Sequence, residues 1–295
     1  CINDVFTMSA VLQECGFRPE EIRTCLDSRA TAEGILERLR WLMDEPMAGD
    51  ELVFYYSGHG AQIPEYGEDF EPDRNVETLV PYDFDWTPER GISDDQIHCL
   101  YSQLPYDVRL AMIFDCCHSG GIHRDGAARP RGISPPDDIR HRQLKWDRTS
   151  GMWVPRDFQP IDPGFTSDEA LRQRYFGREG VSERLGRAAM LRGLSEAEYE
   201  ARKAEQPELP SGPYLPLIIE ACQEGELSYE YRHGATSHGA FTYSLAKILR
   251  EAGGKITFNE LVSRTAEFLA YLQYDQRPQI LGPTEIMNGP VPWGR

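Results

Sequence analysis

Two short apolar runs, each followed directly by a motif of small and reactive residues, constrain the fold of this chain more than any other feature. Leu52–Tyr55 leads into YSGHG at residues 56–60, and Leu110–Phe114 leads into DCCHSG at residues 115–120. Apolar runs of four to eight residues bounded by turn-forming residues are typical of buried β-strands. The sequence therefore predicts two buried strands that end in chemically active motifs.

His59 and Cys117 are the reactive side chains of these motifs. If the two strands are parallel neighbours, both side chains reach the same edge of the sheet, where open α/β folds place their sites. A thiol with its ordinary pKa of about 8.5 is mostly protonated at neutral pH, and only the thiolate attacks a carbonyl well. An imidazole beside it takes the proton and returns it to a leaving amine. We therefore expect Cys117 to be a nucleophile and His59 its general base and acid.

Helical and strand patterns alternate along the rest of the chain. Helices are predicted over residues 3–15, 31–42, 94–100, 240–250 and 258–272, and further strands over 78–81, 217–222 and 279–281. The first strand is expected to end at His59, and residues 223–239 are expected to form a loop. Strands that alternate with helices indicate an α/β fold, with a mostly parallel sheet covered by helices on both faces.

The composition divides the chain into three parts. Residues 1–125 hold both motifs and form the expected large catalytic portion. Residues 126–213 are rich in Gly, Pro, Arg and Asp, which predicts a linker or insertion that is partly disordered. Residues 214–295 return to apolar periodicity and form a small portion that completes the sheet.

Charge and cysteine content exclude several classes of function. The net charge of −17 argues against nucleic acid as the main partner, because phosphate binding needs a basic face. Seven cysteines without CxxC spacing indicate a reducing, cytoplasmic location rather than a disulfide scaffold. No apolar run approaches the roughly 18 residues of a membrane span. The chain opens at Cys1 without Met, so we expect a fragment or a processed product.

Taken together, the two motifs resemble the caspase-like cysteine peptidases of clan CD, family C14, and most closely the metacaspases and orthocaspases. Further family-like segments are CINDV at 1–5, GISDDQI at 91–97, ACQEGELSYE at 221–230 and GAFTYSLAKIL at 239–249. The resemblance covers about residues 1–125 and 214–283. It implies a caspase-like three-layer sandwich, and an endopeptidase that forms a covalent acyl-enzyme.

The resemblance also implies roles for individual residues. The family's nucleophile directly precedes His-Ser-Gly, which is Cys117, and Cys116 is then a packed strand residue. The backbone amides of Gly60 and Cys117 would hold the oxyanion. The residues that line the family's first specificity pocket align with Cys1, Asp4, Ser57 and Asp115. Two carboxylates suit a cationic side chain, which implies protein or peptide substrates cut after arginine or lysine.

Many metacaspases are activated by calcium, and an adjacent aspartate pair of their calcium site corresponds to Asp94 and Asp95. Calcium takes six to eight oxygen ligands, so this pair alone is not a site. Val76 and Arg124 stand where the family has aspartates. The pair equally suits the N-terminus of a helix. Calcium is thus expected at most as an activator, and the chemistry itself requires no cofactor.

Two further expectations concern processing and completeness. The arginines between residues 124 and 203 are either solvated linker positions or include a self-cleavage site, because the expected specificity is for basic residues. The family has a strand before the CINDV segment, in the middle of the sheet, and we expect that strand on a separate piece.

Two other functions remain open. A caspase-like fold can serve as an inactive scaffold or binding module, although His59 and Cys117 are both present here. Cys1 could instead be an N-terminal nucleophile whose own amine acts as base. Enzymes of that kind begin with a strand, whereas this chain is predicted to begin with a helix.

Overall fold

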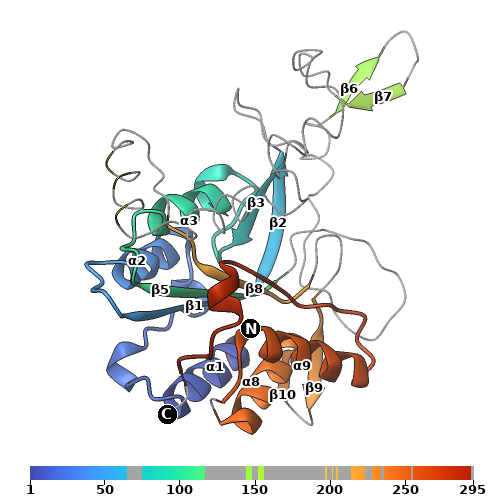
Figure 1. Cartoon of the computed structure of the whole chain (residues 1–295). Coiled ribbons are helices and arrows are strands. Elements are labelled where there is room, and N and C mark those ends of the chain that lie inside the picture. Colours follow the sequence, from blue (N-terminus) through green and yellow to red (C-terminus); the bar gives the residue numbers. More distant parts are fainter. Residues whose placement is uncertain are drawn as a thin grey trace.

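The structure is a computed structural model (Figure 1). It describes residues 1–64, 75–116, 144–147, 152–155, 214–222, 228–233, 236–253 and 255–293, together with the single residues 197, 201 and 204. Cys117 and all the arginines between 124 and 203 lie outside these residues. The proposed self-cleavage site and the division at residues 126–213 therefore stay predictions.

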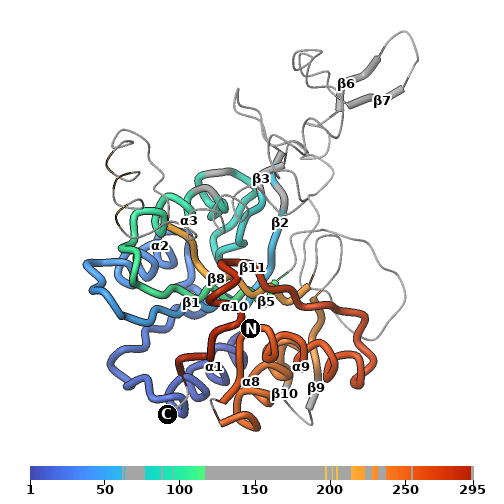
Figure 2. The backbone as a smooth tube through the Cα atoms, viewed as in Figure 1, coloured from blue at the N-terminus to red at the C-terminus, as the bar shows by residue number. Residues whose placement is uncertain are grey.

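A four-stranded sheet forms the centre of the fold. Its order is β1–β5–β8–β11. The bounds are β1 (Glu51–Ser57), β5 (Arg109–Asp115), β8 (Leu217–Glu220) and β11 (Gln279–Leu281). β1, β5 and β8 run parallel and β11 is antiparallel to β8, so the predicted mostly parallel sheet is confirmed. Figure 2 shows the backbone of β8 returning beside β5 from a distant part of the sequence.

Helices cover both faces of this sheet, as Figure 1 shows. One face packs against α1 (Ile2–Glu14), α8 (Ala240–Ala252) and α9 (Phe258–Tyr271); the other packs against α2 (Ala32–Leu42) and α3 (Asp94–Tyr101). Side chains of β5 alternate between the two cores, because successive residues of a strand point to opposite faces. Ile113 packs with α1 and α8, and Met112 packs with α2. The fold is a three-layer α/β sandwich, as predicted.

The helix ends follow local sequence signals. α1 stops before Gly16, whose φ of 105° is a left-handed conformation that suits glycine. At α2 the Thr31 hydroxyl accepts a hydrogen bond from Gly34 N, which satisfies a free helical donor. At α3, Ser93 and Gln96 form a capping box. The helices predicted at these positions are confirmed.

A smaller antiparallel sheet corrects one prediction. It has the order β2–β3–β4 and consists of β2 (His59–Pro64), β3 (Asn75–Val80) and β4 (Ile92–Ser93). His59 was expected to end the first strand, but β1 ends at Ser57 and His59 begins β2. Gly58 separates the two strands, and its lack of a side chain leaves room for the hydroxyl of Tyr56 at this turn.

The segment before α8 corrects another prediction. Residues 223–239 were interpreted as a loop, but β9 (Glu230–His233) and β10 (Thr236–Gly239) pair there as an antiparallel hairpin. Aromatic and polar residues alternate in SYEYRH, which is a strand pattern that the loop prediction overlooked.

The remaining elements are short. They are the antiparallel pair β6 (Leu144–Asp147) and β7 (Met152–Pro155), the helix α10 (Thr284–Met287), and the 3₁₀ turns η1 (Pro19–Glu21), η2 (Asp27–Arg29) and η3 (Pro88–Arg90). None of the helices in the described part of the chain is both long and apolar enough to cross a bilayer.

Candidate active site

The carboxyl ends of β1 and β5 lie side by side. Their parallel register pairs Ser57 with Asp115, and Gly58 N donates a hydrogen bond to the carbonyl of Asp115 at 3.3 Å. His59 follows two residues after Ser57 with an exposed side chain, and Cys117 follows two residues after Asp115 in the sequence. The two predicted reactive residues therefore stand at equal distances along the chain from one paired position. Cys117 itself lies outside the described residues.

The turn before His59 is fixed by Tyr56. Its buried hydroxyl lies 2.9 Å from the carbonyl oxygen of His59 and 3.0 Å from that of Val80, and it donates to these carbonyls. A Cβ atom added to Gly58 would lie 2.4 Å from the Tyr56 hydroxyl oxygen, closer than real contacts allow. Glycine at this position thus lets the hydroxyl of Tyr56 hold the backbone that carries the imidazole.

Asp4 brings a fully buried carboxylate to this edge from α1. Its Oδ1 accepts a hydrogen bond from Gly239 N at 2.7 Å, and its Oδ2 accepts one from Ser57 Oγ at 2.8 Å. The backbone nitrogen of Cys1 lies 3.2 Å from Oδ2. The structure thus brings together three of the four predicted pocket residues, Cys1, Asp4 and Ser57.

Asp115, the fourth predicted pocket residue, is also fully buried. Ser228 Oγ donates to its Oδ1 at 2.7 Å. Thr242 donates to its Oδ2 twice, from Oγ1 at 2.5 Å and from the backbone N at 3.3 Å. Because Ser57 is the register partner of Asp115 and also bonds Asp4, both carboxylates belong to one cluster.

The N-terminus of α8 supports both carboxylates. Gly239 is the N-cap of this helix and Thr242 lies in its first turn, and each donates a backbone N–H, one to Asp4 and one to Asp115. The free N–H groups and the dipole at a helix N-terminus favour negative charge. The first turn of α8 therefore helps to keep two negative charges buried in one place.

Sequence reasoning missed the residues that hold these carboxylates, namely Ser228, Gly239 and Thr242. Ser228 precedes β9, Gly239 ends β10 and Thr242 lies in α8. All three are more than 110 positions away in the chain from the aspartate that each one bonds. Single hydroxyl or glycine residues carry no periodic signal. The family-like segments at 221–230 and 239–249, which contain them, were the one available indication.

The other predicted residues have separate positions. Gly60 is buried in β2 opposite Leu79, and Cys116 is buried directly after β5, as expected of a packed residue. Asp94 and Asp95 are the first two residues of α3. Within the described part of the chain, no three His, Cys, Asp or Glu residues gather as a metal site would require. Calcium as an activator therefore stays a prediction.

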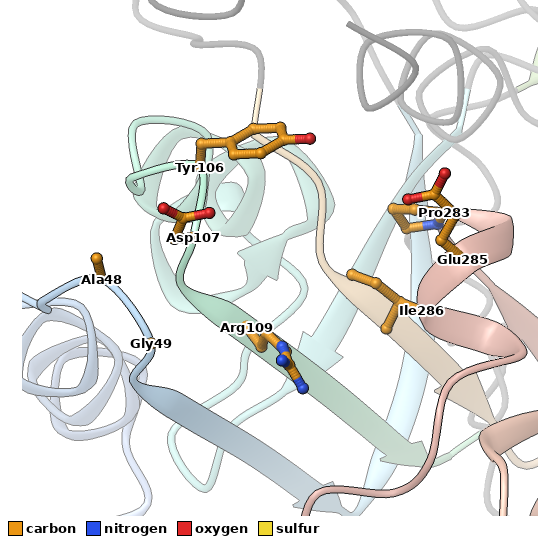
Figure 3. A pocket seen from close by; sticks show the side chains of 8 residues that line it. All are labelled: Ala48, Gly49, Tyr106, Asp107, Arg109, Pro283, Glu285 and Ile286. Carbon is orange, nitrogen blue, oxygen red and sulfur yellow. The ribbon is translucent and has the colours of Figure 1, made fainter. Parts of the chain in front are cut away.

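A pocket of about 450 Å³ opens at the other end of the same strands (Figure 3). It is lined by Ala48, Gly49, Tyr106, Asp107, Arg109, Pro283, Glu285 and Ile286. Gly49 precedes β1 and Arg109 begins β5, so the pocket lies at their amino ends, roughly 20 Å from Ser57 and Asp115 at the strand rise of about 3.3 Å per residue. None of the candidate site residues lines it.

Comparisons with known proteins show which family the chain is similar to. The family model described as "Metacaspase, peptidase C14 domain" matches residues 1–124. Metacaspase-9 of Arabidopsis thaliana is 28% identical over 295 residues, which cover 94% of this chain and 86% of that protein. Metacaspase-1 of Mycosarcoma maydis is 35% identical over 287 residues, which cover 95% of this chain and 65% of that protein. The chain thus spans less than two thirds of the fungal relative.

This chain is similar to the caspase-like cysteine peptidases of the metacaspase type. The residues matched by the family model include α1 with Asp4, the turn with His59 and the DCCHSG motif. A solved structure of a Geobacter sulfurreducens protein has a TM-score of 0.57 and 20% identity, and the match covers 97% of this chain and 86% of that one. At this identity the likeness concerns the fold alone.

Proposed function

We propose that this metacaspase-like chain is an endopeptidase that cleaves proteins or peptides after arginine or lysine. Cys117 acts as the nucleophile and His59 as the general base and acid. The observation that carries the proposal is the parallel register of Ser57 with Asp115, because both reactive residues follow this pair by two positions. Parallel neighbouring strands bring such residues to one edge of a sheet.

The reaction divides between two residues and two backbone amides. His59 takes the proton of the Cys117 thiol, and the thiolate sulfur attacks the carbonyl carbon of the scissile bond. The N–H groups of Gly60 and Cys117 stabilise the oxyanion. When the C–N bond breaks, His59 returns the proton to the leaving amine. Water, activated by the same imidazole, then hydrolyses the thioester.

The basic specificity is supported by the two buried carboxylates. Asp4 and Asp115 are both fully buried around Ser57 and the first turn of α8. A cationic side chain that enters such a region gains ion pairs, whereas an acidic side chain would meet repulsion in a medium of low dielectric. Arginine and lysine are therefore the residues expected before the cleaved bond.

The test compares two neighbouring thiols. Cys117→Ala should abolish hydrolysis of a fluorogenic arginine peptide, whereas Cys116→Ala should retain it, because Cys116 is a buried packing residue. An arginyl chloromethyl ketone should label Cys117 in peptide mapping. Equal turnover by wild type and Cys117→Ala would refute the proposal in favour of a scaffold, and labelling at Cys1 would indicate an N-terminal nucleophile.

Activation is a separate part of the proposal. Cleavage after an arginine in the segment 124–203 would be a self-processing step, since the proposed specificity is for basic residues. Calcium remains a proposed activator and no chemical step depends on it. Intact-mass analysis of the purified protein with and without calcium would report both the cut position and the ion dependence.

A further inference from the structure

Two buried polar atoms without partners lie close to the candidate pocket. Within the described part of the chain, Nδ1 of His238 and Oε1 of Gln276 are the buried side-chain nitrogen and oxygen atoms that make no hydrogen bond. Nearly all buried polar groups in folded proteins are paired, so each such atom calls for an explanation. Both belong to residues that border the carboxylates. Their positions point to a ligand that carries hydrogen-bond donors.

Gln276 borders Asp115 through one intermediate residue. Its Nε2 donates to the carbonyl of Ala221 at 2.7 Å and lies 3.4 Å from Ser228 Oγ, which in turn donates to Asp115. The carbonyl of Ala221 can only accept, so the amide nitrogen must face it and the amide orientation is fixed. Oε1 is therefore the acceptor that remains, on a side chain that is 3% exposed.

His238 borders Asp4 in a comparable way. Its Nδ1 lies 3.6 Å from Asp4 Oδ1, beyond hydrogen-bonding distance. The neutral ring has two tautomers, so Nδ1 is either a donor or an acceptor. The inference is therefore built on Gln276, whose acceptor atom is defined by its neighbours.

We propose that Gln276 is a specificity-determining residue, whose Oε1 accepts a hydrogen bond from the guanidinium group of a substrate arginine. This inference rests on the proposed function of the same pocket. A guanidinium presents five N–H donors in a planar fork, whereas a lysine ammonium has three donors around one point. Asp4 and Asp115 supply the charge that both cations need. A neutral acceptor beside them can bond an additional N–H of the wider guanidinium group. Gln276 therefore favours arginine over lysine.

The test is the ratio of kcat/KM for two peptides that differ only in arginine or lysine before the cut. In wild type this ratio should favour arginine. Gln276→Leu should lower it by about tenfold or more, through loss of activity on the arginine peptide alone, because a pocket atom built to bond a donor discriminates strongly. Gln279→Leu is the matched control: this glutamine lies in β11 and bonds Glu220. It should leave the ratio unchanged.

A binding measurement separates specificity from folding and from catalysis. Calorimetry in the Cys117→Ala background measures the affinity for n-butylguanidine and for n-pentylamine. Gln276→Met should weaken the binding of n-butylguanidine and leave the affinity for n-pentylamine unchanged. Gln276→Met keeps the side-chain volume, so it serves if the leucine variant does not fold. An unchanged arginine-to-lysine ratio and unchanged guanidine affinity would overturn the role of Gln276. Failure of wild type to cut either peptide would instead refute the proposed function.

Discussion

The two ends of the parallel strands β1 and β5 differ in how their polar groups are held. At the carboxyl ends, Asp4 and Asp115 are fully buried and accept hydrogen bonds from three separate segments of the chain. At the amino ends, the pocket of Figure 3 has a volume of about 450 Å³, but its Arg109 is 54% exposed and pairs with Glu51 at the surface. The open cavity is thus at one end, and the buried charge is at the other.

This difference supports the carboxyl ends of β1 and β5 as the place of the proposed chemistry. Burying a carboxylate is costly unless several donors compensate it, so a protein that buries two of them in one place has a use for their charge. An open pocket with exposed charges requires no such explanation. The convergence of donors, rather than the volume of the cavity, locates the candidate active site.

The largest expected effect comes from removing a carboxylate at one end and not the other. Asp115→Ala leaves the donors Ser228 and Thr242 without an acceptor, which should cost about 1–3 kcal/mol of folding stability. It should also lower kcat/KM for an arginine peptide roughly a hundredfold or more, because breaking a buried ion pair costs about 3 kcal/mol or more.

Asp107→Ala is the control for that measurement, since Asp107 lines the pocket at the amino ends and is exposed. Asp107→Ala should change neither the folding stability nor kcat/KM for the arginine peptide measurably. Equal losses of activity in both variants would show that the comparison between the two ends is wrong.

A smaller effect is expected from the two glycines that flank β1. Gly58→Ala drives a methyl group into the Tyr56 hydroxyl and displaces the backbone of His59, so activity should fall about tenfold or more together with stability. Gly49→Ala meets open space, but its φ of 89° strains an alanine, which should cost about 1 kcal/mol.

Steady-state kinetics and urea unfolding on the same preparations would separate the two glycine variants. Only Gly58→Ala should lose activity under conditions where both proteins are folded. If Gly49→Ala were equally impaired, the turn at Gly58 would have no special part in positioning the imidazole.

The smallest effects concern two exposed or half-buried glutamates whose pKa values move in opposite directions. Burial raises the pKa of Glu51 despite Arg109, so the folded state loses stability as the pH rises through that pKa. Hydrogen bonding to Arg250 lowers the pKa of Glu14, so its contribution is present above the unfolded pKa of about 4.3 and is lost as the pH falls.

Urea unfolding between pH 3 and pH 7 tests both signs. Glu14→Gln should cost a few tenths of a kcal/mol at pH 7 and less at pH 3, because the ion pair with Arg250 is exposed. In Glu51→Gln, the free energy of unfolding should fall less than in wild type as the pH rises above about 4.5. A Glu51 variant with the same pH dependence as wild type would contradict the role of burial.

The sequence predicts the elements well where hydrophobic periodicity and end signals coincide. The helices predicted over residues 31–42 and 258–272 are present in the structure, and each begins after a threonine cap. β2 and the β9–β10 hairpin were not predicted, because their identity depends on partners elsewhere in the chain. Pairing with distant strands overrides weak local preference.

The candidate site divides in the same way. The resemblance gave Asp4, Ser57 and Asp115, and the structure brings these three together. Ser228 and Gln276 were not predicted, because a single hydroxyl or amide gains meaning only from the neighbours it meets after folding. Local sequence patterns thus predict most helices and strands. The residues that surround Asp4 and Asp115 depend on long-range contacts.

The hydrogen bonds to Asp115 make the part of the chain before residue 126 depend on the part after residue 213. A fragment that ends at residue 125 would retain His59 and Cys117. It would lack Ser228 and Thr242, whose hydrogen bonds stabilise the buried carboxylate of Asp115. A cut between residues 126 and 213 would break none of these hydrogen bonds, provided that β8 stays paired with β5. Cleaving the polypeptide and dissociating its two fragments are therefore different events for this molecule. Only dissociation removes the hydrogen bonds that hold Asp115 in the proposed binding site for a basic side chain.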